Sequence, residues 1–124
     1  MNNQQRPVFL PVLKYRYPIT AIASILHRIS GVILFLVIPL LLCALQASLS
    51  SAQGFQRLKT ALHHPLAISI LWIILAALFY HLVAGIRHLL MDIGVGESRQ
   101  AGRTTAWIVI LVTVVLLIVT AIWL

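Results

Sequence analysis

Apolar residues are gathered into three long runs, separated by two shorter polar segments. The first run extends from Ile19 to Leu45 and contains Pro39 as its single helix breaker. A helix of this length measures about 40 Å, which exceeds a hydrocarbon core of about 30 Å. We therefore predict a helix over 18–48, beginning at Pro18, with its lipid-crossing part over 29–48 and a bend at Pro39.

The other two runs predict two further helices. Pro65 opens the second run, which predicts a helix over 65–90, and the third run, without any charge, predicts a helix over 105–124. Between the first and second helices we expect a polar loop over 46–64, with a short amphipathic piece around 55–62. Between the second and third helices we expect a glycine-bearing loop over 91–104. Because helices satisfy their own backbone groups in lipid, the pattern predicts an all-α membrane protein with three transmembrane helices.

The chain begins with a basic arm over residues 1–17. Pro7, Pro11 and Pro18 prevent a continuous helix there, because proline removes a backbone donor and restricts the residue before it. We expect this arm to be irregular and to lie in the cytoplasm.

The composition favours lipid over water as the solvent of this chain. Of its 124 residues, 61% are hydrophobic and 9% are charged, and the mean hydropathy is +1.04. A soluble domain carries roughly 25% charged residues, so this chain could not cover a water-facing surface. We expect one membrane-anchor domain over 1–124. The single cysteine, Cys43, excludes an intrachain disulfide.

The positive charges predict orientation rather than nucleic-acid binding. The net charge is +7, but the Lys and Arg residues lie between the apolar runs and do not form one basic patch, so we expect no nucleic-acid partner. Arg57 and Lys59 lie after the first run, and the other seven lie on the opposite side of the membrane. Because cytoplasmic loops hold the excess of Lys and Arg, we predict a cytoplasmic N-terminus and a periplasmic C-terminus.

His81 is the deepest ionisable residue of the second run, with four apolar turns before it. An ionisable side chain within a membrane span is costly, and it is by default a hypothesis for function. His81 shares a helix face with Gly85 and His88, at spacings of four and seven residues. In the first run, Ser24, His27, Arg28 and Gly31 have spacings that also predict one shared face.

Haem iron is one partner that His81 could have. A neutral imidazole in a low-dielectric site is a natural axial ligand, and the absent side chain of Gly85 could let a flat macrocycle approach. His27, Arg28 and His88 stand at a height that suits the haem propionates. Since only His81 is deep, the second ligand is expected from another subunit. His27 as a second ligand within the chain is the alternative.

Ser24 and Arg28 also suggest a quinone site. A hydroxyl and a guanidinium one helical turn apart can hydrogen-bond a quinone carbonyl, and the cation stabilises negative charge on the reduced oxygen. Asp92, at the inner edge of the second span, could exchange protons or hold Arg28 or Arg87 in place.

Structural roles stand beside each of these functional ones. His81 could instead be a packing histidine that is hydrogen-bonded across helices. Arg28 could extend toward the headgroups, with Ser24 in a small-residue helix contact. The residues alone establish a small three-helix membrane subunit and leave haem binding open.

Two stretches resemble a known family. They are PITAIASILHRISG over 18–31 and YHLVAGIRHLLMD over 80–92, with Arg6-Pro7 in the arm. These residues resemble the patterns Ser-x-x-His-Arg-x-[Ser/Thr]-Gly and His-x-x-x-Gly-x-Arg-His-[Leu/Met]-x-x-Asp of the cytochrome b membrane-anchor subunits of bacterial succinate dehydrogenase, respiratory complex II. The resemblance covers essentially the whole chain.

The resemblance implies a role for each matching residue. His81 would be one axial ligand of haem b, and a second membrane-anchor subunit would supply the other. Ser24 and Arg28 would line the ubiquinone site, with Asp92 nearby, and His27, Arg28 and His88 would contact the haem propionates. The chain would have no catalytic residue for succinate. It would anchor the iron–sulfur and flavoprotein subunits at the bacterial inner membrane and help to pass their electrons to ubiquinone.

Two other functions are compatible with the same residues. The nearest is an anchor of a quinol:fumarate reductase, in which the reaction runs in the opposite direction. The second is a haem-free membrane scaffold subunit, for which the replacement of His81 would have no functional consequence.

Overall fold

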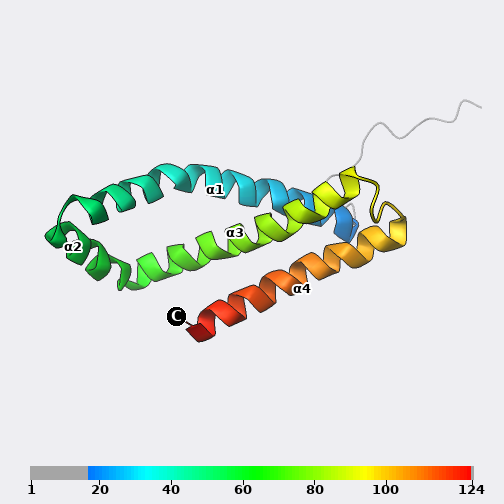
Figure 1. The fold of residues 1–124 in the computed structure, drawn as a ribbon. Helices are drawn as coiled ribbons and strands as arrows, with labels where there is room; N and C mark the ends of the chain where they lie inside the picture. Colours follow the sequence, from blue (N-terminus) through cyan, green and yellow to red (C-terminus); the bar gives the residue numbers. More distant parts are fainter. Residues whose placement is uncertain (1–16, 124) are drawn as a thin grey trace, which may run out of the picture.

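The computed structural model describes residues 17–123, which form four helices (Figure 1). These are α1 (Ile19–Ser50), α2 (Ala52–Leu62), α3 (Pro65–Asp92) and α4 (Arg99–Trp123). Three of them, α1, α3 and α4, are long and apolar enough to cross a membrane. This confirms the predicted all-helical fold with three apolar helices. Residues 1–16, which include most of the predicted arm, and Leu124 lie outside the described residues.

The long helices extend further than hydropathy alone predicted. α1 ends at Ser50 rather than at 48, and α3 ends at Asp92 rather than at 90. The largest difference is at α4, which begins at Arg99 and not at 105. Ser98 caps its start, since its side chain accepts from the amide of Ala101 at 3.1 Å. Helices begin where the backbone is capped, and a helix can therefore include polar turns outside the apolar run.

The two connections differ in character. The predicted polar loop over 46–64 contains α2, which includes the expected amphipathic piece and is capped by Ser51. The loop predicted over 91–104 is reduced to residues 93–98. Gly94 and Gly96 have φ angles of 83° and 81° there, a region that other residues rarely adopt. These two glycines make the tight reversal between α3 and α4 possible.

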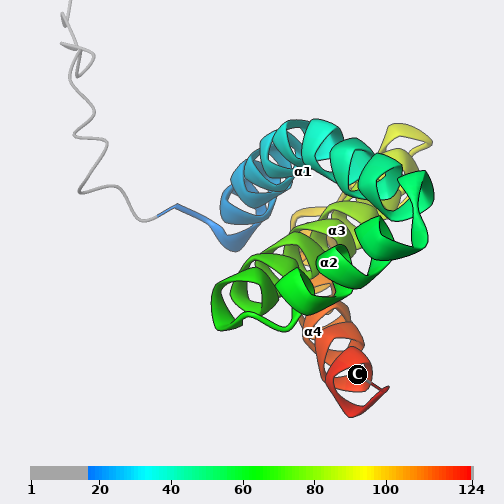
Figure 2. The ribbon, with the colours of Figure 1, turned by 90° about the vertical axis from the view of Figure 1, so that its left-hand side faces the viewer.

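The helix α3 lies between α1 and α4 (Figures 1 and 2). α1 begins beside the α3–α4 turn, and α2 closes the opposite end of the α1–α3 pair (Figure 1). α1 continues through Pro39 and bows over α3 (Figure 2). A proline within a helix removes one backbone hydrogen bond and favours such bending.

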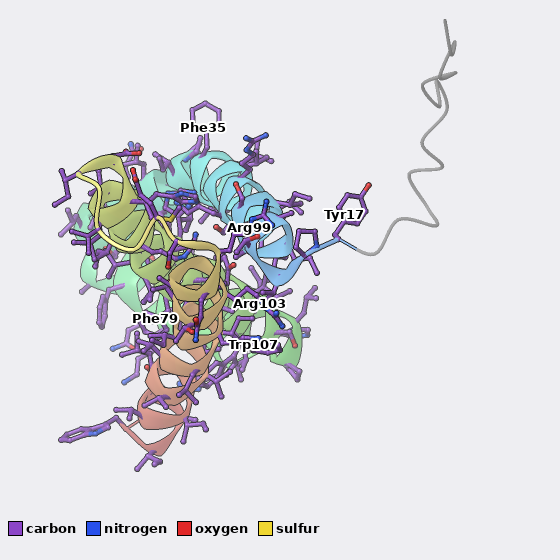
Figure 3. The ribbon with its side chains drawn as sticks, turned by 90° about the vertical axis from the view of Figure 1, so that its right-hand side faces the viewer. Tyr17, Phe35, Phe79, Arg99, Arg103 and Trp107 are labelled. Carbon is purple, nitrogen blue, oxygen red and sulfur yellow. The ribbon has the colours of Figure 1, made fainter. Side chains whose placement is uncertain are left out.

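Small residues make the helix contacts. The buried apolar residues are alanine or valine: Ala23, Ala77, Ala84, Ala106 and Val109. Small side chains allow membrane helices to approach closely, so that packing rather than hydrophobic exclusion holds them together. The large apolar side chains point outward, as Phe35 does with 71% exposure (Figure 3). The outer faces of the bundle are therefore suited to lipid or to other apolar helices.

Candidate functional site

The imidazole of His81 on α3 packs against Gly31 on α1. A Cβ atom at residue 31 would lie 3.0 Å from Cε1 of His81 and 3.4 Å from its Nδ1. This is closer than a real Cβ atom normally approaches another atom. The absence of a side chain at Gly31 therefore makes the space that the imidazole occupies.

The hydrogen bonds of His81 determine which of its nitrogens carries the proton. Nδ1 lies 3.2 Å from the backbone carbonyl oxygen of His27 and 3.2 Å from Oγ of Ser30. A carbonyl oxygen can only accept, so Nδ1 must be the donor in the neutral ring. The other nitrogen, Nε2, then carries a lone pair. It makes no hydrogen bond with any other residue that the structure describes.

His27 of α1 lies against the same ring. The imidazoles of His27 and His81 are stacked, with centroids 4.2 Å apart and an angle of 14° between their planes. His88 approaches His27 with a centroid distance of 4.9 Å and an angle of 46°. The structure thus brings together the three histidines that the sequence singled out.

Each of the two helices packs a histidine against a glycine of the other helix. His81 of α3 rests on Gly31 of α1, and His27 of α1 faces Gly85 of α3, where a Cβ atom would lie 3.5 Å from Nε2. Gly85 was expected to let a macrocycle approach. In the structure Gly85 accommodates the ring of His27, and the approach of a macrocycle there stays a prediction.

His27 and His81 differ in how their Nε2 atoms are enclosed. Nε2 of His27 is the single buried side-chain nitrogen or oxygen without a hydrogen-bond partner in the described part of the chain. Nε2 of His81 also lacks a partner among the described residues, but the His81 side chain is half-buried and its Nε2 is not fully enclosed.

The predicted shared face of α1 is divided. His27 and Gly31 face α3, but Arg28 is exposed and Ser24 is half-buried. Successive residues in a helix are separated by about 100°, so Arg28 cannot follow His27 into the contact. Ser24 and Arg28 remain one turn apart.

Asp92 ends α3 and is exposed. It forms no ion pair with any residue in 17–123, so the expectation that it holds Arg28 or Arg87 is wrong for the described chain. Arg87 has other partners. Its Nε donates to Oγ1 of Thr105 at 3.0 Å, and its Nη2 donates to the carbonyl oxygen of Gly102 at 3.2 Å.

Sequence reasoning missed three contributors to this region. Arg87 is only 7% exposed and ties α3 to α4. Tyr80 donates to the carbonyl oxygen of Ala23 at 3.0 Å and ties α3 to α1 beside His81. Ser30 is 4% exposed and contacts His81 directly. The hydroxyl of Ser30 falls three residues after His27, and this helical spacing was the one available signal.

No group of three or more His, Cys, Asp or Glu side chains that could hold a metal ion occurs within residues 17–123. A single axial nitrogen of the kind at His81 is not such a group. It can serve a metal only when the remaining ligands come from elsewhere, as they do in a haem.

Comparisons with known proteins agree with these features. The profile of the succinate dehydrogenase/fumarate reductase transmembrane subunit family matches residues 2–120. The succinate dehydrogenase cytochrome b556 subunit of Coxiella burnetii is 43% identical over 122 residues, which cover 98% of both chains. The cytochrome b556 subunit of Paracoccus denitrificans is 34% identical, over 98% of this chain and 94% of its own. The cytochrome b560 subunit of Reclinomonas americana is 34% identical, over 87% of this chain and 78% of its own.

The chain therefore belongs to the succinate dehydrogenase/fumarate reductase transmembrane subunit family, and it is a membrane-anchor subunit of the cytochrome b556 kind. The family resemblance seen in the two sequence stretches is confirmed.

Proposed function

We propose that this membrane anchor of succinate dehydrogenase binds one haem b through Nε2 of His81. The observation that carries the proposal is the bond from Nδ1 of His81 to the carbonyl oxygen of His27, which leaves the Nε2 lone pair without a partner among the described residues. Metal-bound histidines typically donate their other ring N–H to such a carbonyl. The relatives are named as b-type cytochromes, which hold a haem b.

The haem would be shared with a second membrane-anchor subunit. Two axial histidines must stand on opposite sides of the macrocycle and direct their nitrogens at the iron. The rings of His27 and His81 are instead stacked at 4.2 Å, and Nε2 of His27 is buried toward Gly85. This arrangement argues against His27 as the second ligand and favours a histidine from a partner helix.

His27, Arg28 and His88 would hold the haem propionates, and His27 would do so through its Nδ1, because its Nε2 is enclosed at Gly85. The rings of His27 and His88 adjoin each other, and Arg28 follows His27 in α1 on the exposed side. Hydrogen bonds from imidazole and guanidinium groups to carboxylates offset the cost of placing two negative charges at the membrane edge. When bound, the haem supplies a one-electron redox centre beside these residues.

Ser24 and Arg28 would form part of the ubiquinone-reduction site. Ser24 is half-buried and Arg28 is exposed one turn later, so both can direct donors at the same carbonyl oxygen. The guanidinium of Arg28 would stabilise the negative charge that develops on this oxygen as the quinone is reduced. Asp92, exposed at the end of α3, would stand near this site and could supply protons.

The site would face the cytoplasm. Arg28, Arg87, Arg99 and Arg103 lie toward the end of the bundle that holds the start of α1 and the α3–α4 turn, whereas Arg57 and Lys59 lie on α2 at the other end. Arg99, Arg103 and Trp107 follow one another along the outside of α4 (Figure 3), a pattern typical of the membrane interface. The iron–sulfur and flavoprotein subunits would dock at this cytoplasmic face of the bacterial inner membrane.

A reduced-minus-oxidised absorption spectrum of the chain, co-expressed with its complex partners in membranes, tests the proposal. We expect the absorption bands of a b-type cytochrome, stoichiometric with flavin. A spectrum that contains flavin and iron–sulfur absorption alone would overturn haem binding and would favour a haem-free anchor.

A further inference from the structure

We propose that Ser30 is a positioning residue that fixes the tautomer and the orientation of His81, and thereby tunes the haem it holds. The inference rests on the proposed function, in which His81 is the axial ligand through Nε2.

Ser30 connects the two groups that hold Nδ1 of His81. Its hydroxyl donates to the carbonyl oxygen of His27 at 2.8 Å, and its Oγ lies 3.2 Å from Nδ1 of His81. Since the hydroxyl proton is committed to the carbonyl, Oγ faces Nδ1 with a lone pair and accepts from it. The Nδ1 proton is therefore shared between two oxygens, the carbonyl of His27 and the hydroxyl of Ser30.

This pair of acceptors leaves the ring of His81 little freedom. The N–H bond is directed between the two oxygens, the Cε1 edge abuts Gly31, and the ring of His27 is stacked at 4.2 Å. Ser30 is 4% exposed, so water does not replace its hydroxyl. Rotation of the ring would break both bonds inside a low-dielectric contact, where unmade hydrogen bonds are costly.

A hydrogen bond accepted from Nδ1–H also raises the basicity of Nε2. A more basic axial ligand stabilises the oxidised iron relative to the reduced iron and so lowers the reduction potential. Loss of the Ser30 hydroxyl removes one of two acceptors. We therefore expect the haem midpoint potential to rise when the hydroxyl is removed, with a change in the g-values that report ring orientation.

The sharpest test is a pair of replacements with the same shape, Ser30→Thr and Ser30→Val, in the assembled complex. Threonine keeps the hydroxyl and valine does not. The readouts are the haem midpoint potential from an optical redox titration and the electron paramagnetic resonance spectrum. We expect Ser30→Thr to match the parent protein and Ser30→Val to have the higher potential. Identical potentials and spectra in the two variants would overturn the role of Ser30.

Ser48→Ala is the matched control. Ser48 lies in α1 and donates to the carbonyl of Leu45 at 2.8 Å, the same local bond that Ser30 makes, but without an imidazole partner. We expect no change in potential. If Ser30→Val and Ser48→Ala shift the potential equally, the effect belongs to the helix and the proposal fails.

If a variant assembles poorly, the amount of haem per assembled complex is measured as a second readout. Retention of haem in Ser30→Thr with its loss in Ser30→Val supports the proposal, whereas equal loss in both would overturn it, because volume would then be the cause. The failure of the underlying haem proposal is recognised separately, since the parent complex would then lack b-type bands or His81→Ala would keep them.

Discussion

The helix α3 places polar side chains into two contacts, and these contacts differ in what they leave unsatisfied. Toward α4, the guanidinium of Arg87 donates to Thr105 and to Gly102, and both acceptors lie in this chain. Toward α1, the imidazoles of His81 and His27 are stacked, and each keeps an Nε2 atom without a partner among the described residues. One contact is complete within the chain, and the other is not.

This difference separates structural from functional polar groups in a membrane span. A polar side chain in lipid that has its partners within the fold contributes to helix association. A side chain that keeps an unused nitrogen at the same depth has a cost that packing alone does not explain. We infer that the α1–α3 contact is where a group from outside the chain binds, and that the α3–α4 contact holds the bundle together.

The largest expected effect is on the α1–α3 side. His81→Ala removes the lone pair proposed to bind iron, and we expect the b-type absorption bands to be lost entirely. A reduced-minus-oxidised spectrum of the purified complex measures this. His63→Ala, at the end of α2, is the control and should keep the full spectrum. Unchanged bands in His81→Ala would contradict the inference that a haem binds at the α1–α3 contact through His81.

Arg28 is exposed, whereas Arg87 is buried, and we expect their replacements to affect different properties of the complex. Arg28→Ala should slow ubiquinone reduction about tenfold to a hundredfold, because it removes a charged donor from the developing negative charge. Succinate oxidation with an artificial acceptor, measured in the same preparation, should change little. Equal losses in the two assays would show that Arg28 acts on assembly rather than on the quinone.

Arg87→Met, in contrast, should lower the stability of the complex and leave its haem site intact. It removes both bonds between α3 and α4, and we expect a destabilisation of about 1–3 kcal/mol. Thermal denaturation of the purified complex measures the loss, and Arg103→Met, at an exposed position, is the control. The haem spectrum per assembled complex should stay the same. A shifted spectrum would place Arg87 in the haem site and contradict its purely structural role.

A pair of glycine replacements tests whether close packing in the α1–α3 contact holds His81 in place. In Gly31→Ala the new methyl group would meet His81 at 3.0 Å, so we expect the ring to shift and the haem absorption and resonance spectra to change. In Gly102→Ala the methyl group would lie 3.5 Å from Thr20, an ordinary contact, so we expect the parent spectra. Identical spectra in both variants would show that the close packing against Gly31 does not constrain His81.

The smallest effect is expected at Tyr80. Tyr80→Phe removes one hydrogen bond to the carbonyl of Ala23, and interhelical bonds of this kind contribute about 0.6 kcal/mol in membrane proteins. Denaturation of the complex should reveal a shift smaller than that of Arg87→Met. Loss of haem in this variant would mean that Tyr80 also orients the α1–α3 contact.

Several parts of this site follow from the sequence because they depend on local spacing. His81 and His88 are seven residues apart, so any helix places them on one face. The approach of His27 to both could be anticipated only from the family resemblance, since no local rule relates residues that are 54 and 61 positions apart. The start of α4 at Arg99 was missed because hydropathy marks the apolar part of a helix, whereas Ser98 marks where its backbone begins.

Hydropathy and residue spacing were sufficient to identify lipid as the solvent, to predict the three apolar helices and to place His81, Gly85 and His88 on one face of α3. The contacts of His81 with Gly31, of His27 with Gly85 and of Arg87 with Thr105 became apparent only from the packing of the helices. The reason is geometric. Spacing sets the angles between side chains on one helix, but the rotation of each helix about its own axis is set by how its small residues pack against the others.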